Sequence, residues 1–248
     1  MFVIIDLSNM KGSLIMTNTK ICQSCAMPMT AADHGTNADG TPSADFCKFC
    51  MKNGKMGDCT MEQMADICAD IDLRDGRAAD KQAAVNMYMS VLPMLKRWGG
   101  TGTMEYEVVE LPQMTVRGLG CRTSNTAPDM SEKIGGLWKS FFGGVFQSID
   151  KKASPYTYGV YSNYATDFTG EYDMTVGCQV TEDSVSDNTV TTVIPRGKYA
   201  KFTLHGDAQK DIYAFWCRLW FMPLDRAYTA DFEEYVSEHD FNIYISIK

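Results

Sequence analysis

The sequence lacks the features of a membrane-spanning or exported protein. No stretch approaches the roughly 20 consecutive apolar residues that a helix needs to cross a bilayer. The opening residues, MFVIIDLSNMKGSLIM, contain only a short apolar run and no small-residue cleavage site. We therefore expect a reducing, cytoplasmic location. Residues 1–18 match neither of the two regions considered below, so we expect a disordered tail there, with Met16 as an alternative start.

The sequence also has little positive charge. Its 248 residues include 23 Lys and Arg against 31 Asp and Glu, a net charge of −8. Residues 104–248 carry 20 acids and 13 bases, and residues 19–70 carry seven acids and four lysines; only residues 71–103 are slightly basic. Non-specific binding to nucleic acid depends on neutralisation of phosphates by Lys and Arg. The charge distribution therefore disfavours direct binding of DNA.

Motifs of the common catalytic sites are missing as well. The chain has no Ser/His/Asp elbow, no Cys/His nucleophile arrangement and no Gly-rich phosphate loop. His205 and His239 belong to no cluster with the spacing of metal ligands. These absences favour a binding or regulatory protein over an enzyme.

Two Cys-x-x-Cys pairs are the most informative feature that is present. Cys22/Cys25 and Cys47/Cys50 are separated by 21 residues, close to the spacing of a zinc ribbon. Each pair can form a tight knuckle, and four thiolates with no open position suit a structural zinc ion. The alternatives are two disulfides or unrelated buried thiols.

Three further residues could replace one of these thiolates. His34 lies between the pairs, and Cys59 and Cys68 follow them. Because four cysteines already complete a site, we expect His34 to be a loop residue. Cys68 falls on the apolar stripe of an expected helix, so we expect it to be buried.

The chain divides into two expected domains. Residues 19–58 are rich in turns and cannot bury much apolar surface, so this segment depends on its metal to hold its shape. A helix is expected after the N-cap Thr60, with its apolar stripe formed by Met61, Met64, Ile67 and Cys68. A second is expected from about residue 77 to 92. The Gly-rich run 99–103 is the predicted linker between domains 19–98 and 104–248.

Residues 104–248 form two copies of one pattern. Each copy has an apolar-Pro step (Leu111-Pro112 and Ile194-Pro195) before a strand, then a helix with apolar residues at 3–4 spacing, then two more strands. Two strand-helix-strand-strand units predict an α+β domain with an antiparallel sheet and helices on one face.

Both regions resemble known families. CQSCAMPM, GTNADGTPSADFCKFC and KNGKMGDCTMEQM resemble a zinc-ribbon domain common in bacterial and archaeal proteins, over about residues 20–98. YGVYSNY, YDMTVGCQV, VIPRGKYAKFTLHG and DFEEY…FNIYISI resemble the GyrI-like small-molecule-binding domain, which is also the effector-binding half of AraC-type regulators. This resemblance implies a pseudo-symmetric pair of units with a ligand cleft between them. The zinc ribbon occupies the place of the regulators' helix-turn-helix half.

The resemblance also implies a pocket glutamate on the penultimate strand, at Glu233. Alternation along a strand puts Glu233 and Tyr235 on one face and Glu234 on the other, and Glu234 stays an alternative because the sequence does not show which face the helices cover. An acid beside a phenol suits an aromatic cation. We expect Tyr158, Tyr161 and Trp138 as pocket wall, with ordinary core packing as the alternative.

Together these features predict an effector-binding protein. The expected ligand is a small, lipophilic, cationic compound, and the ribbon is expected to contact a protein partner. One alternative is a hydrolase in which burial raises the pKa of Glu233 so that it assists attack by water. The other is a transcriptional regulator whose ribbon contacts DNA directly.

Overall fold

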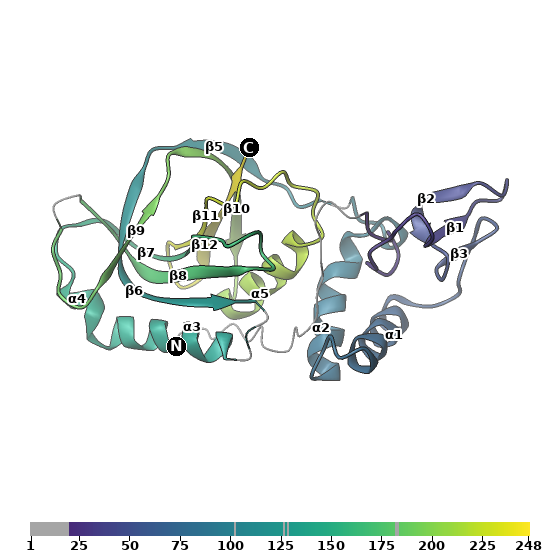
Figure 1. Ribbon diagram of the computed structural model, residues 1–248, viewed down its shortest axis with the longest axis horizontal. Coiled ribbons are helices and arrows are strands. Elements are labelled where there is room, and N and C mark those ends of the chain that lie inside the picture. The colour runs from purple at the N-terminus through teal and green to yellow at the C-terminus, as the bar shows by residue number, and fades with distance from the viewer. Residues whose placement is uncertain (1–19, 102, 126, 128, 182–183) are drawn as a thin grey trace. The chain divides into compact units, whose positions relative to one another are not determined.

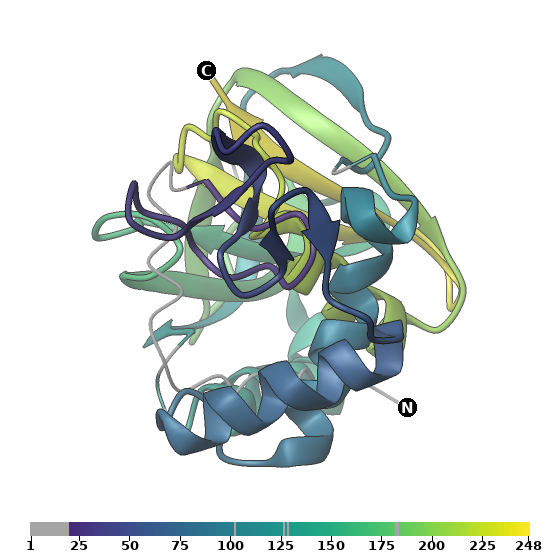
Figure 2. The same cartoon turned by 90° about the vertical axis from the view of Figure 1, so that its right-hand side faces the viewer.

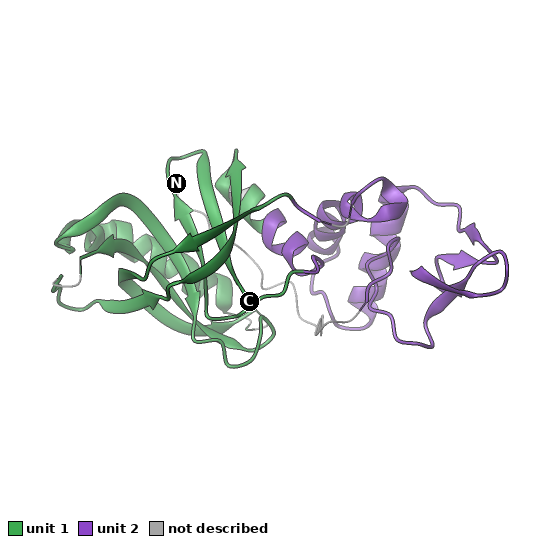
Figure 3. Cartoon of the chain, turned by 90° about the horizontal axis from the view of Figure 1, so that it is seen from above, with its two compact units in different colours: residues 1–8, 105–213, 224–248 green, residues 9–104, 214–223 purple. Residues whose placement is uncertain are grey.

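The computed structural model describes residues 20–248 except 102, 126, 128, 182 and 183, so the expected tail at 1–18 lies outside the described residues. The described chain divides into two compact units (Figure 3). One contains the residues up to 104 together with Ala214–Pro223, and the other contains Glu105–Tyr213 and Leu224–Lys248. No helix in the described part of the chain is long and apolar enough to span a membrane.

The N-terminal unit combines short hairpins with two helices. Its elements are β1 (His34–Thr36), β2 (Pro42–Cys47), β3 (Met51–Lys52), β4 (Lys55–Met56), α1 (Met61–Arg74), α2 (Lys81–Val91), η1 (Leu92–Met94) and η2 (Lys96–Trp98). Thr60 caps α1: its hydroxyl accepts from the amide of Gln63, and the Gln63 side chain accepts from the amide of Thr60. Helices α1 and α2 lie side by side (Figures 1 and 2). Ile67, expected on the buried stripe of α1, is 49% exposed.

The second unit is built on one curled antiparallel sheet of eight strands. Its strands are β5 (Glu107–Leu111), β6 (Met114–Ser124), β7 (Lys152–Ser162), β8 (Glu171–Val180), β9 (Val190–Ile194), β10 (Gly197–His205), β11 (Ala230–Tyr235) and β12 (Asp240–Ile247). They are ordered β5-β10-β12-β11-β7-β8-β6-β9. This architecture confirms the predicted α+β fold.

The strand order displays the duplication. The first repeat supplies β5–β8, the second supplies β9–β12, and β7 pairs with β11 at the centre of the sheet. Pro112 and Pro195 follow the short first strand of each repeat, and proline interrupts a ladder because it has no N–H to donate. Each short strand then pairs with the other repeat, β5 with β10 and β9 with β6. Glu233, on β11, therefore lies at the junction of the two repeats.

Helix α3 (Met130–Ser140) packs against β6 and β8 (Figure 1). It buries Ile134 and Trp138. The sequence pattern predicts one helix over residues 131–149, but the helix is interrupted. A π-helical segment, η3 (Phe141–Val145), follows α3, and a short α4 (Phe146–Ser148) follows that. Gly144 has φ 158° and ψ −26°, a conformation that glycine adopts readily and that breaks the helical hydrogen-bond pattern. The second repeat has the helix α5 (Ala208–Leu219) in the corresponding place.

Candidate functional site

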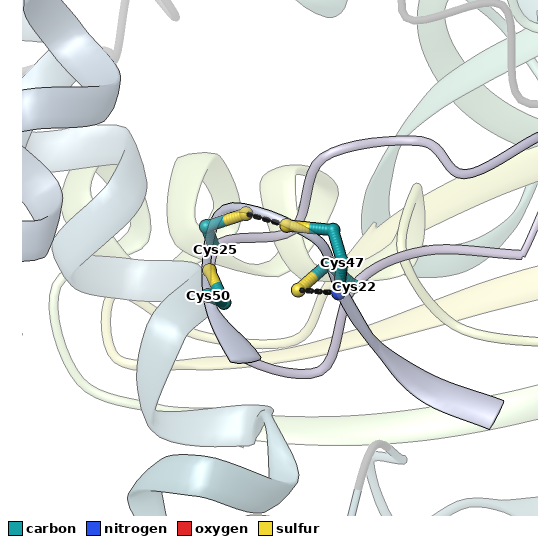
Figure 4. A group of neighbouring side chains, drawn as sticks. All are labelled: Cys22, Cys25, Cys47 and Cys50. Carbon is teal, nitrogen blue, oxygen red and sulfur yellow. Dashed lines mark hydrogen bonds between the residues drawn. The ribbon is translucent and has the colours of Figure 1, made fainter. Parts of the chain in front are cut away.

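The four paired cysteines form one buried cluster. Cys22, Cys25, Cys47 and Cys50 have Sγ atoms within 4.8 Å of one another (Figure 4). The Sγ atoms of Cys25 and Cys47 are 3.9 Å apart. A tetrahedral zinc ion with Zn–S bonds of about 2.3 Å separates its sulfurs by about 3.8 Å, whereas a disulfide requires about 2.05 Å. The geometry therefore fits a shared metal and not a pair of disulfides.

The hydrogen bonds within the cluster favour a thiolate at Cys22, whereas they raise the pKa of Cys25 and Cys50. The backbone amide of Cys47 donates to Cys22 Sγ at 3.2 Å. The pKa of the Cys22 thiol is lowered, chiefly by hydrogen bonds from the other three thiols. Metal binding requires deprotonated cysteine, so the lowered pKa of Cys22 assists formation of the first metal–sulfur contact in the cluster.

The alternative ligands lie outside this set. His34 Nδ1 is 2.6 Å from the carbonyl oxygen of Ser43, in a strand of the ribbon. Burial raises the pKa of the Cys68 thiol to about 12, so this residue stays protonated, and its Sγ is 3.8 Å from the carbonyl oxygen of Cys25. Cys59 Sγ accepts a hydrogen bond from Arg97 at 3.3 Å.

Arg97, in η2 after the two helices, contacts the turn that contains Cys22 and Cys25. Its guanidinium donates to Ser24 Oγ at 3.0 Å and to the carbonyl oxygens of Gly57 and Cys59 at 2.6 and 3.1 Å. The indole of Trp98 donates to the carbonyl oxygen of Ser24 at 2.8 Å. Residues 20–98 are thus one module. Sequence reasoning missed Arg97, because a single arginine carries no motif of its own.

In the second unit, Glu233 is a buried carboxylate at the centre of the sheet. Only 1% of its surface is exposed. Oε1 accepts from the hydroxyl of Tyr161 at 2.9 Å, and Oε2 accepts from the hydroxyl of Tyr235 at 2.7 Å. Burial, and then the charge of Glu233, raise the pKa of both phenols well above the usual value. Both phenols therefore stay protonated and remain donors to the carboxylate.

Trp138 brings aromatic surface to the same place from α3. Its ring meets Tyr235 edge to face, with centroids 5.0 Å apart, and stacks with Phe142 at 5.9 Å. Gly159 is directly opposite Glu233 in the β7–β11 ladder. A Cβ atom placed on Gly159 would be 3.0 Å from Glu233 Oε2 and 3.5 Å from Trp138 Cζ2. The carboxylate and the indole thus meet over Gly159, on the face of the sheet that α3 covers.

Tyr158 lies on the opposite face of the sheet. Its hydroxyl donates to Glu234 Oε1 at 3.0 Å, and Glu234 Oε2 accepts from Asn242 at 2.9 Å and from Tyr244 at 3.2 Å. This face has its own core: Val116, Tyr158, Val160, Ile194, Tyr199, Phe232 and Tyr244. The structure therefore brings Glu233, Tyr235, Tyr161 and Trp138 together and leaves Tyr158 apart from them.

Comparison with known families assigns both units. Residues 107–247 match the family described as "Integron-associated effector binding protein", and this match covers more than half of the chain. The chain belongs to this effector-binding family. Residues 21–99 match the family described as "Putative zinc ribbon domain". The four-cysteine cluster is accordingly the ligand set of a structural zinc ion. None of the curated proteins matches the chain.

Solved structures resemble part of the chain. An integron cassette protein from the mobile metagenome of Vibrio cholerae is 30% identical, with 58% of this chain and 95% of that chain covered and a TM-score of 0.47. A protein solved with bound tetraphenylphosphonium is 16% identical, covering 58% of this chain and 94% of that chain, with a TM-score of 0.48. EcmrR, solved in a complex with DNA, is 15% identical, covering 77% and 74%, with a TM-score of 0.40.

Two residues of the effector-binding domain were missed from the sequence. Gly159 is the first, because its missing side chain leaves room for the Glu233 carboxylate and the Trp138 indole. Met174 is the second, because its Cε atom would be 3.2 Å from a Cβ atom on that glycine. A glycine inside a strand indicates close approach of another group. The glycine in the pattern YGVY could therefore have predicted that another side chain lies close to Gly159. Nothing in the sequence distinguishes Met174 from an ordinary core residue.

Gly159→Ala is expected to lower the free energy of unfolding by about 1–3 kcal/mol, because the added methyl group overpacks the space beside Glu233 Oε2. Urea unfolding monitored by tryptophan fluorescence measures the change. The matched control is Gly136→Ala on the exposed side of α3, where an added Cβ meets no atom within 4 Å. Alanine should stabilise that helix by roughly 0.5–1 kcal/mol. Equal effects of the two substitutions would contradict the close approach at Gly159.

Proposed function

We propose that the effector-binding domain binds a lipophilic organic cation against Glu233. The observation that carries this proposal is a buried carboxylate surrounded by aromatic rings, with Tyr161 and Tyr235 donating to its two oxygens. A cation gains electrostatic attraction from the carboxylate and from the π-faces of Trp138 and Tyr235. Its apolar body gains burial against the same rings.

The position of Glu233 supports the proposal. The carboxylate lies where β7 of the first repeat pairs with β11 of the second, so both repeats contribute side chains around it. Tyr161 comes from the first repeat, Tyr235 from the second, and Trp138 from the helix of the first. A ligand at this point would contact both repeats of the domain. Its binding could therefore change how the two repeats pack against each other. We propose that this coupling is the basis of a regulatory role.

Titration of the full-length protein with tetraphenylphosphonium tests the charge requirement. Triphenylphosphine oxide is the matched neutral ligand, because it has similar aromatic groups and no net charge. If the carboxylate attracts the ligand's charge, the cation should bind at least about tenfold more tightly, which corresponds to about 1.4 kcal/mol. Calorimetry and tryptophan fluorescence give the two dissociation constants. Equal affinities would show that the site selects apolar surface alone and would remove Glu233 from the proposal.

A further inference from the structure

The second zinc knuckle presents an aromatic ring to solvent. Phe49, between the ligands Cys47 and Cys50, is 75% exposed, whereas both cysteines are buried. A zinc ion held by both cysteines would fix the backbone on each side of Phe49. Lys48 Nζ lies 5.5 Å from the ring centroid and 3.1 Å from Asp33 Oδ1. A single exposed apolar side chain is common on protein surfaces, so it does not by itself define a binding site.

The neighbouring hairpin places two like charges opposite each other. Lys52 of β3 and Lys55 of β4 are direct cross-strand partners, and among the described residues neither forms an ion pair. Like charges in this position destabilise a hairpin. Two hydrogen bonds to Thr36 nevertheless hold the hairpin in place. The amide of Asn53 donates to Thr36 Oγ1, and the amide of Gly54 donates to the carbonyl oxygen of Thr36, each at 2.8 Å. An anionic group between the two ammonium groups would remove their repulsion.

We propose that Phe49, Lys52 and Lys55 form a docking surface for an acidic segment of a partner protein. Carboxylates of the segment would pair with the two ammonium groups, and one apolar side chain would pack on the Phe49 ring. Of the three lysines in residues 46–57, Lys48 pairs with Asp33, so Lys52 and Lys55 are the two that can pair with carboxylates of a partner.

The charge around this surface favours a peptide over a nucleic acid. Residues 20–98 carry ten acids and nine bases, and four thiolates on one zinc add about −2. A polyanion such as DNA or RNA is attracted through the summed charge of a domain, which is negative here. A short acidic segment needs only the local pairing and the apolar contact.

A peptide array with the full-length protein tests this docking surface. The probes are 12-residue peptides with net charges from −4 to +4, each made with and without a single Leu or Phe, at 150 mM salt. Retention of the wild-type protein should rise as the peptides become more acidic. Lys52→Glu together with Lys55→Glu should lower retention on acidic peptides at least tenfold. Phe49→Ala should remove the preference for peptides that contain Leu or Phe.

The controls separate docking from folding and from overall charge. The pair Lys52→Glu and Lys55→Glu keeps two like charges opposite each other, so the hairpin should be no less stable, and the zinc content should stay near one per chain. If it falls, Lys52→Gln with Lys55→Gln replaces it and should also lose retention. Arg196→Glu with Lys198→Glu, two exposed residues of the other unit, makes the same change in net charge and should leave retention unchanged.

Three results would overturn the proposal. The first is retention of the wild-type protein that does not depend on peptide charge. The second is an unchanged preference for acidic peptides in zinc-loaded protein with both lysines substituted. The third is tighter binding of a 12-residue oligothymidylate than of any peptide through the same three residues, which would assign the surface to single-stranded nucleic acid.

Discussion

Cys47→Ser is expected to reduce the zinc content of the purified protein from about one ion per chain to nearly none. Serine cannot supply the fourth soft ligand of a four-thiolate site. Residues 20–58 have only short strands, so the metal-free segment should lose its structure. Elemental analysis of the metal and protease sensitivity of the segment measure the two effects.

Matched cysteine variants make this result specific. Cys68→Ser changes a buried thiol that lies outside the ligand set, and Cys59→Ser changes a half-exposed one, so both variants should keep their zinc. The effector-binding domain should stay folded in Cys47→Ser, because its sheet is formed entirely from residues 107–247 and includes no strand of the ribbon. Full zinc in Cys47→Ser, or loss of zinc in Cys68→Ser, would show that the ligand set is wrong.

Glu233→Gln is expected to weaken the binding of tetraphenylphosphonium by about ten- to a hundredfold, or roughly 1–3 kcal/mol. The amide keeps the volume of the side chain but removes its charge. It also replaces one acceptor of the Tyr161 and Tyr235 hydrogen bonds with a donor. Triphenylphosphine oxide is the control for this rearrangement, because the affinity for a neutral ligand should change little between the wild-type protein and Glu233→Gln. Calorimetric titration of both ligands gives the comparison.

Glu234→Gln is the control for this result. Glu234 is the next residue of the same strand and also accepts from tyrosines, but it lies on the face opposite Trp138. The affinity for both ligands should stay at the wild-type value. Equal losses in the two variants, or no loss at Glu233, would contradict the proposed site. If Glu233→Gln instead abolished slow turnover of a reactive compound while it still bound, the hydrolase alternative would take precedence.

The parts of this structure that were predicted from the sequence depend on local spacing. The zinc ligands follow from two Cys-x-x-Cys pairs, whose spacing within each pair is enough to form a knuckle. The duplicated unit follows from two proline steps and two helical stripes. The same alternation that separates Glu233 from Glu234 also separates Tyr158 from Tyr161, which are three residues apart. That reasoning, applied to β7, would have removed Tyr158 from the expected pocket wall.

The features that were not predicted depend on contacts between distant segments. Gly159 faces Glu233 because of the register between β7 and β11, and that register is set by packing across more than 70 residues of chain. After α3, the apolar stripe predicts a continued helix, whereas the Gly143-Gly144 pair predicts a break. The structure has the break, at Gly144. Arg97 bonds to Ser24, 73 residues earlier in the chain, and no local pattern marks it.

The position of a bound cation in a crystal of the full-length protein tests directly whether the ligand binds against Glu233. Tetraphenylarsonium has the shape and charge of the phosphonium, and its arsenic atom is located by anomalous scattering. If Glu233 binds the cation, a single strong peak should lie on the face of the sheet covered by α3, with Glu233 as the nearest carboxylate and the Trp138 and Tyr235 rings beside it. A peak beside Glu234, or away from the β7–β11 junction, would contradict binding against Glu233.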